Sequence, residues 1–166
     1  MSNFPSPDDR VFAKRGRDEM RRWLSEKHFT HFVTLAFNEP EVGKMRMRQS
    51  LKHWDACANR ALLGKRWRKK VDERLNWIAI PEKQQANPHW HVLMQILPDQ
   101  FEEFEEREPY LGFEDVLSTL WRKIVPSGTV DVQLVESKGA HTYVTKQLNI
   151  PENFEDFVVF WEFFEL

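Results

Sequence analysis

Alternating apolar and polar positions predict four β-strands. The segment Thr30 to Phe37 (THFVTLAF) is rich in β-branched and aromatic residues, which is typical of a central strand. Leu75 to Ile80 and Trp90 to Leu97 follow, joined by the polar turn Glu82 to Pro88. Val130 to Val135 alternates again. Because a short polar turn separates the second and third strands, we expect them to form an antiparallel hairpin.

Helical periodicity predicts the elements between these strands. Met47, Leu51, Trp54, Ala58 and Leu62 recur at steps of three or four, the spacing of one helix face, and Gly64 ends that helix. Further helices are expected over Asp8 to Lys27, Val116 to Ile124 and Gly139 to Leu148. The order predicts an α+β fold, in which an antiparallel sheet of about four or five strands is packed against helices, as in a two-layer sandwich.

A chain of 166 residues is of the size that one hydrophobic core can serve, so we expect a single domain over residues 1–166. Residues 1–28 extend it with a helix, and residues 151–166 form an aromatic C-terminal tail. The tail is expected to pack on the core, with a dimer or helicase contact as the alternative. The single Cys57, the lack of a signal peptide and the lack of a membrane-length apolar run indicate a cytoplasmic protein.

The net charge of −2 hides a strong asymmetry. Lys44 to Lys70 holds ten basic residues against one acid, a local charge of +9, whereas Asp99 to Asp115 holds eight acids against one base, or −7. Such a segment is most often a solvated helix face, but a basic lobe with an interleaved tryptophan also suits phosphate contacts and base stacking. The candidate nucleic-acid contacts are Arg46, Arg48, Lys52, Lys65, Arg66, Trp67, Arg68, Lys69 and Lys70.

Two histidines spaced i, i+2 stand in the third predicted strand. His89 and His91 point to one face of the sheet, because strand side chains alternate, whereas Trp90 and its apolar successors point to the helix-covered face. Glu82, at the end of the preceding strand, lies across the turn from both. Two imidazoles and one carboxylate would leave open positions on a metal ion, which is a catalytic arrangement. A hydrogen-bonded histidine pair is the alternative interpretation.

The predicted helix Gly139 to Leu148 carries a second chemical group. Tyr143, Lys146 and Gln147 share one face of it, because residues three and four apart are neighbours on a helix. A phenol beside an ammonium group is a candidate nucleophile, since a nearby cation favours its ionised form. An amphipathic helix with a tyrosine at its border is the alternative.

Three segments, taken in order, resemble the motifs of the HUH endonucleases, which nick single-stranded DNA in rolling-circle replication and in transposition. They are Phe32 to Leu35, Pro88 to Val92 and Tyr143 to Lys146, and the resemblance spans about Thr30 to Leu148. It implies that Glu82, His89 and His91 hold Mg²⁺ or Mn²⁺ and that Tyr143 is the nucleophile, with Lys146 beside it. Thr34 falls in the first motif, whose role is mainly structural. Gln147 matches a position that joins the metal shell in tyrosine transposases of the superfamily.

The resemblance implies metal-dependent, sequence-specific nicking and joining of single-stranded DNA through a covalent 5′-phosphotyrosine, initiating rolling-circle replication of a plasmid or phage-like element. A single-tyrosine transposase is the first alternative. An inactive nucleic-acid-binding module and a metal hydrolase that uses water are the others. The expected partners are single-stranded or melted origin DNA, a host helicase and a possible second subunit; no membrane is expected. The helicase is expected because the chain has no phosphate-binding loop of its own.

Overall fold

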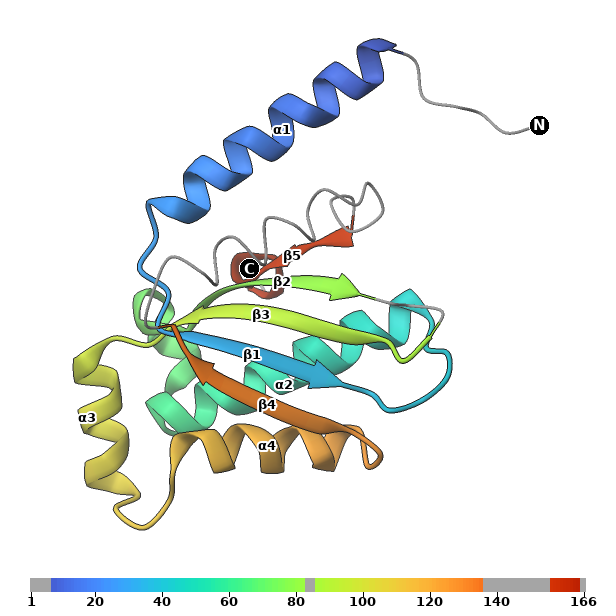
Figure 1. Cartoon of the computed structure of the whole chain (residues 1–166). Coiled ribbons are helices and arrows are strands. Elements are labelled where there is room, and N and C mark those ends of the chain that lie inside the picture. Colours follow the sequence, from blue (N-terminus) through green and yellow to red (C-terminus); the bar gives the residue numbers. More distant parts are fainter. Residues whose placement is uncertain (1–6, 83–85, 136–155, 165–166) are drawn as a thin grey trace.

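The computed structural model describes residues 7–82, 86–135 and 156–164. Five strands form one antiparallel sheet in the order β4-β1-β3-β2-β5 (Figure 1). The predicted α+β class is therefore confirmed. The strands are β1 (His31–Ala36), β2 (Asn76–Glu82), β3 (His89–Gln95), β4 (Thr129–Leu134) and β5 (Val158–Val159).

Helices pack on one face of this sheet. In Figure 1, α2 and α4 lie along that face, and α3 stands beside them. The predicted end of α2 is confirmed, since Gly64 has a φ of +81°, a conformation that favours glycine, and its N–H donates to the carbonyl of Arg60. The helices are α1 (Pro7–Ser25), α2 (Lys44–Leu63), α3 (Pro98–Arg107) and α4 (Phe113–Ile124), with short 3₁₀ helices η1 (Trp67–Lys69), η2 (Val71–Glu73) and η3 (Phe160–Phe163).

Two elements escaped the prediction, and one prediction has no counterpart in the described residues. Helix α3 lies in the segment that its acidic residues marked only as charged; it buries Gln100 and Phe104 alone. Strand β5 has two residues, which is too short for an alternating pattern to register. The predicted helix Gly139 to Leu148 lies outside the described residues.

The main core fills the space between the sheet and the helices. Trp90, Val92, Met94 and Ile96 point into it, as the alternation in β3 predicted. Large aromatic side chains complete it, among them Trp54, Trp77 and Trp121, each almost fully buried. Burial of such side chains supplies most of the driving force for folding.

The opposite face of the sheet is less open than the pattern suggested. Leu24 at the end of α1 and Phe29 just after it pack with Ile78, Ile80 and Leu93 in a second, smaller cluster. The expectation of a sheet with one open face was wrong over this area, because β2 and β3 present apolar side chains on both faces, and exposing them would be costly. α1 itself projects away from the sheet (Figure 1).

The C-terminal residues pack on the core, as predicted. Val158 and Phe163 are buried in the main cluster, and β5 pairs with β2 at the edge of the sheet. The ring centroid of Phe163 lies 5.5 Å from that of Trp77. None of the helices in the described parts of the chain combines the length and the apolar character needed to cross a bilayer.

Candidate metal centre

Strand register brings the three predicted ligands together. Glu82 is the register partner of His89, and Ile80 is the partner of His91, so both imidazoles and the carboxylate stand at one end of the β2–β3 hairpin. Because His89 and His91 are two residues apart, they project from the same face. The hairpin geometry therefore supplies the grouping that the sequence predicted.

The ligand atoms converge on one point. Oε2 of Glu82 lies 2.6 Å from Nε2 of His91 and 3.2 Å from Nε2 of His89, and the two nitrogens are 3.1 Å apart. His91 is buried, whereas Glu82 and His89 are partly exposed. A substrate can thus reach the group from the side of Glu82 and His89.

The remaining ring nitrogens have partners of their own. Nδ1 of His89 lies 3.0 Å from the carbonyl oxygen of Asn87, which can only accept, so this nitrogen carries the hydrogen and Nε2 presents a lone pair. Nδ1 of His91 lies 3.3 Å from the hydroxyl of Thr34. The ring of Phe32 stacks on the imidazole of His91, with centroids 5.2 Å apart. These contacts fix the orientation of both rings.

This geometry fits a metal ion. Adjacent ligands of an octahedral ion with bonds of about 2.1 Å lie about 3 Å apart, close to the separations in this group. Two lone-pair nitrogens and a carboxylate oxygen repel one another unless a cation or protons lie between them. Glu82, His89 and His91 could therefore hold a metal ion, and they form the one such group of three among residues 7–82, 86–135 and 156–164.

Asn87 is the part of the site that sequence reasoning missed. Its φ of +59° is left-handed, a conformation that asparagine tolerates better than most residues. This backbone conformation belongs to the turn that presents its carbonyl to His89. The signal was an asparagine before a proline in the turn, which marks a turn without indicating that its carbonyl would orient a ligand.

The proposed nucleophile lies elsewhere in the chain. Tyr143, Lys146 and Gln147 are outside the described residues, so their predicted roles stay predictions. The other tyrosine, Tyr110, is almost fully exposed in the segment between α3 and α4.

Two of the predicted nucleic-acid contacts are engaged in ion pairs. Arg46 forms a bidentate pair with Glu39, at 2.5 and 2.8 Å, and its hydrogen bonds hold the pKa of Glu39 below the ordinary value. Nη2 of Arg48 lies 2.7 Å from Oε2 of Glu162. Both guanidinium groups therefore already have acidic partners within the chain.

The basic segment after α2 lies at the other end of the molecule from the candidate ligands. Asn59 near the end of α2 contacts Leu75 just before β2, whereas Glu82 ends β2, about 20 Å further along the strand. Lys65, Arg66, Arg68 and Lys69 are exposed, and Lys70 pairs with Glu73.

The predicted stacking platform, Trp67, is itself covered. It packs against the main core, and the guanidinium groups of Arg68 and Arg74 lie 5.5 and 4.9 Å from its ring centroid. Lys52 lines a cavity of about 220 Å³ beside Trp67 and Arg74. A nucleic-acid role for these residues stays a prediction.

Comparison with known proteins agrees with the motif analysis. No curated protein and no solved structure matches the chain at a significant level. Residues 30–150 match the protein family described as Replication-associated protein ORF2, a range that contains the candidate ligands and most of the sheet. With nearly three quarters of its length matched, the chain belongs to this ORF2 family of replication-associated proteins.

Proposed function

We propose that the protein is a metal-dependent nickase of single-stranded DNA that initiates rolling-circle replication through a covalent 5′-phosphotyrosine. The observation that carries this proposal is the convergence of Glu82 Oε2, His89 Nε2 and His91 Nε2 on one point. The family match supports a role in replication, which favours initiation over transposition.

The proposed chemistry is transesterification. A divalent cation, Mg²⁺ or Mn²⁺, would supply Lewis-acid polarisation of a phosphate oxygen. The phenol of Tyr143 loses its proton to solvent, and its oxygen attacks the phosphorus. The bond to the 3′ oxygen breaks as the tyrosine–phosphate bond forms, and the 3′ oxygen takes a proton, for which we propose Lys146 as the donor. Because one phosphoester replaces another, a 3′ hydroxyl can reverse the step without ATP.

The ligand residues also restrict the substrate. They lie on the surface of a sheet end, with Glu82 and His89 partly exposed. A paired duplex would keep its bases stacked and would not present a splayed phosphate there, so the proposed substrate is single-stranded or locally melted DNA. Unwinding would then come from a separate helicase.

A labelling experiment tests the chemistry and its polarity. The protein is incubated with Mn²⁺ and a random-sequence pool of single-stranded DNA, labelled at the 3′ end in one reaction and at the 5′ end in another. We expect a labelled protein band on a denaturing gel only with the 3′ label, because the tyrosine retains the 5′ phosphate of the downstream fragment.

Tyr110→Phe is the matched control, since it removes the other phenol from an exposed position. The adduct should persist in Tyr110→Phe and disappear in Tyr143→Phe and Glu82→Gln. An equal adduct from Tyr143→Phe, or none from the wild type, would overturn the mechanism. Cleavage without an adduct would indicate a hydrolase that uses water, and binding without cleavage would indicate a binding module.

A further inference from the structure

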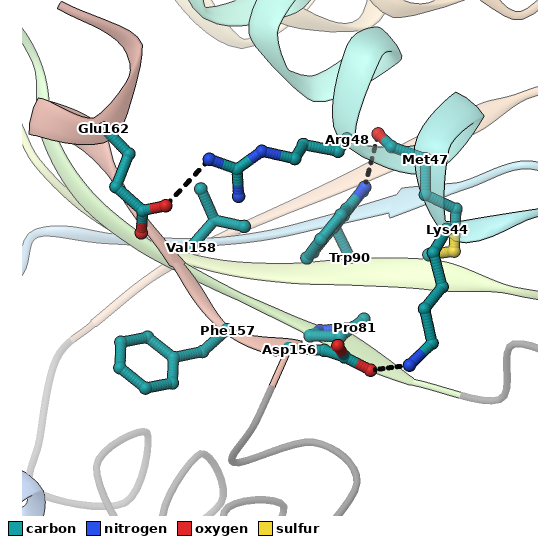
Figure 2. Close-up of a pocket in the computed structure, with 9 residues that line it drawn as sticks. All are labelled: Lys44, Met47, Arg48, Pro81, Trp90, Asp156, Phe157, Val158 and Glu162. Atoms are coloured by element: carbon teal, nitrogen blue, oxygen red, sulfur yellow. Dashed lines mark hydrogen bonds and ion pairs between the residues drawn. The ribbon is translucent and has the colours of Figure 1, made fainter.

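The C-terminal segment, residues 156–163, makes ion pairs with the first turns of α2. Nζ of Lys44 lies 2.6 Å from Oδ2 of Asp156, and Nη2 of Arg48 lies 2.7 Å from Oε2 of Glu162. Lys44 and Arg48 are four residues apart, so they occupy the same face of α2. Figure 2 shows the two ion pairs on either side of Trp90 and Val158. Two neighbouring cations are thus matched one to one by two carboxylates.

This charged surface lies at the metal-ligand end of the sheet. The residues between the ion pairs line a cavity of about 210 Å³, which includes Pro81 and Trp90. Pro81 directly precedes Glu82, and Trp90 stands between His89 and His91. The indole Nε1 of Trp90 donates to the carbonyl of Met47, which ties the first turns of α2 to β3 (Figure 2). A DNA strand leaving the candidate ligands across the β2 edge would meet Lys44 and Arg48 first.

The other basic groups are further away. Helix α2 has 20 residues and is therefore about 30 Å long, so the segment after its C-terminal end cannot contact the same few nucleotides. Arg46 is held by Glu39 through two hydrogen bonds. Lys44 and Arg48 are consequently the best-placed cations for phosphates next to the scissile one.

The two ion pairs are suited to exchange. The side chains of Lys44 and Arg48 are 67% and 47% exposed, and exposed pairs of this kind contribute little to stability. Phosphate oxygens accept hydrogen bonds from lysine and arginine as well as carboxylates do. Val158 and Phe163 stay buried in the core, so only the two acidic side chains, not the segment, have to move.

We propose that Lys44 and Arg48 form a phosphate-backbone site for single-stranded nucleic acid beside the metal centre, and that Asp156 and Glu162 occupy it in place of phosphates until nucleic acid displaces them. The identity of the ligand rests on the proposed function; the competition between carboxylate and phosphate rests on the contacts. The carboxylates act as an internal competitor, which weakens binding to nucleic acid that makes no further contacts at the metal centre.

The test measures binding of a fluorescent thymidine oligonucleotide by anisotropy, without metal and at several salt concentrations. Asp156→Asn with Glu162→Gln should raise the affinity roughly tenfold, because two exposed ion pairs no longer compete. The salt dependence should also steepen, by about 0.7 in the log–log slope for each phosphate contact that no longer displaces a carboxylate. Thermal unfolding verifies that each variant is folded.

The matched control is Glu102→Gln with Glu106→Gln, which makes the same change in net charge on the exposed surface of α3. It should leave the affinity nearly unchanged. In a Lys44→Gln, Arg48→Gln background the oligonucleotide should bind more weakly, and the Asp156 and Glu162 substitutions should then have no effect.

An equal gain from the α3 control, a gain that persists without Lys44 and Arg48, or no gain at all would overturn the inference. A loss of affinity would overturn it as well. Because the binding assay needs neither metal nor cleavage, its outcome is independent of the adduct experiment. A protein that forms the Tyr143 adduct but shows no gain would refute the competition alone. A gain without any adduct would refute only the nickase.

Discussion

The hydroxyl of Thr34 lies 3.3 Å from Nδ1 of His91, on the neighbouring strand and in direct register. A neutral imidazole that presents Nε2 to a metal carries its hydrogen on Nδ1, and the Thr34 oxygen can accept it. Such outer contacts orient metal-ligating histidines and raise their basicity. The motif that looked structural in the sequence thus acts on a candidate ligand.

Thr34→Val should weaken metal binding at nearly constant stability. The substitution keeps the shape and removes the hydroxyl, and the loss of such a contact typically costs 10- to 100-fold in metal affinity. Titration calorimetry with Mn²⁺ measures this effect. Thr34→Ser retains the hydroxyl and should bind Mn²⁺ much as the wild type does. Equal affinities for the valine variant and the wild type would show that Thr34 does not orient His91.

The donor set should prefer Mn²⁺ to Mg²⁺. Two of the three ligands are imidazoles, which suit transition metals better than they suit Mg²⁺. Mn²⁺ should therefore raise the melting temperature at lower concentrations than Mg²⁺; at 100 times the dissociation constant a ligand stabilises by about 2.7 kcal/mol.

Glu82→Gln should abolish most of this metal-dependent shift, whereas Glu106→Gln, which removes an exposed carboxylate on α3, should preserve it. The same Mn²⁺ shift in both variants would argue against Glu82 as a ligand.

Asp55 should make stability fall as the pH rises from about 4 to 6. Burial raises the pKa of this carboxyl to about 6, although hydrogen bonds from Trp77 and Asn59 act in the opposite direction. In this range the unfolded chain has lost the Asp55 proton that the folded chain still holds. The folded state thus binds more protons, and its stability decreases with pH until both states are ionised.

Asp55→Asn keeps the acceptor and never ionises. Its stability relative to the wild type should increase between pH 4 and 6 and then level off, with a gain of roughly 3 kcal/mol at most. Urea unfolding of both proteins across this range measures the difference, in which other titrating groups cancel. Parallel profiles would contradict the elevated pKa.

Gly128→Ala should destabilise the end of β1. A Cβ at this position would lie 2.5 Å from Nε1 of Trp121 and 2.9 Å from the carbonyl oxygen of Ala36, the two groups joined by a 2.9 Å hydrogen bond. Overpacking of this kind typically costs about 1–3 kcal/mol, which urea unfolding can measure.

Gly43→Ser is the control, because a Cβ there meets nothing within 4 Å and a serine suits the N-cap of α2. Its stability should equal or exceed that of the wild type. If both substitutions cost the same, close packing at Gly128 is not the cause.

The sequence predicted features that depend on local pattern. Alternation placed β1 to β4, and the ligands Glu82, His89 and His91 could be grouped because one hairpin carries all three. The pairing of Arg48 with Glu162 could not be predicted, since the two residues are 114 positions apart and nothing local to either indicates the other. Helix α3 was missed because its two buried residues give too weak a periodic signal among its acids.

The locality of the metal ligands also has a consequence for folding kinetics. Glu82 and His91 lie within ten residues, whereas β1 pairs with β4 between positions 36 and 129, which are 93 apart. Contacts of short sequence separation cost less chain entropy and form earlier. Pulsed hydrogen exchange should therefore protect amides of β2 and β3 before those of β4; simultaneous protection would contradict this order. A metal that binds so early would accelerate folding rather than slow unfolding.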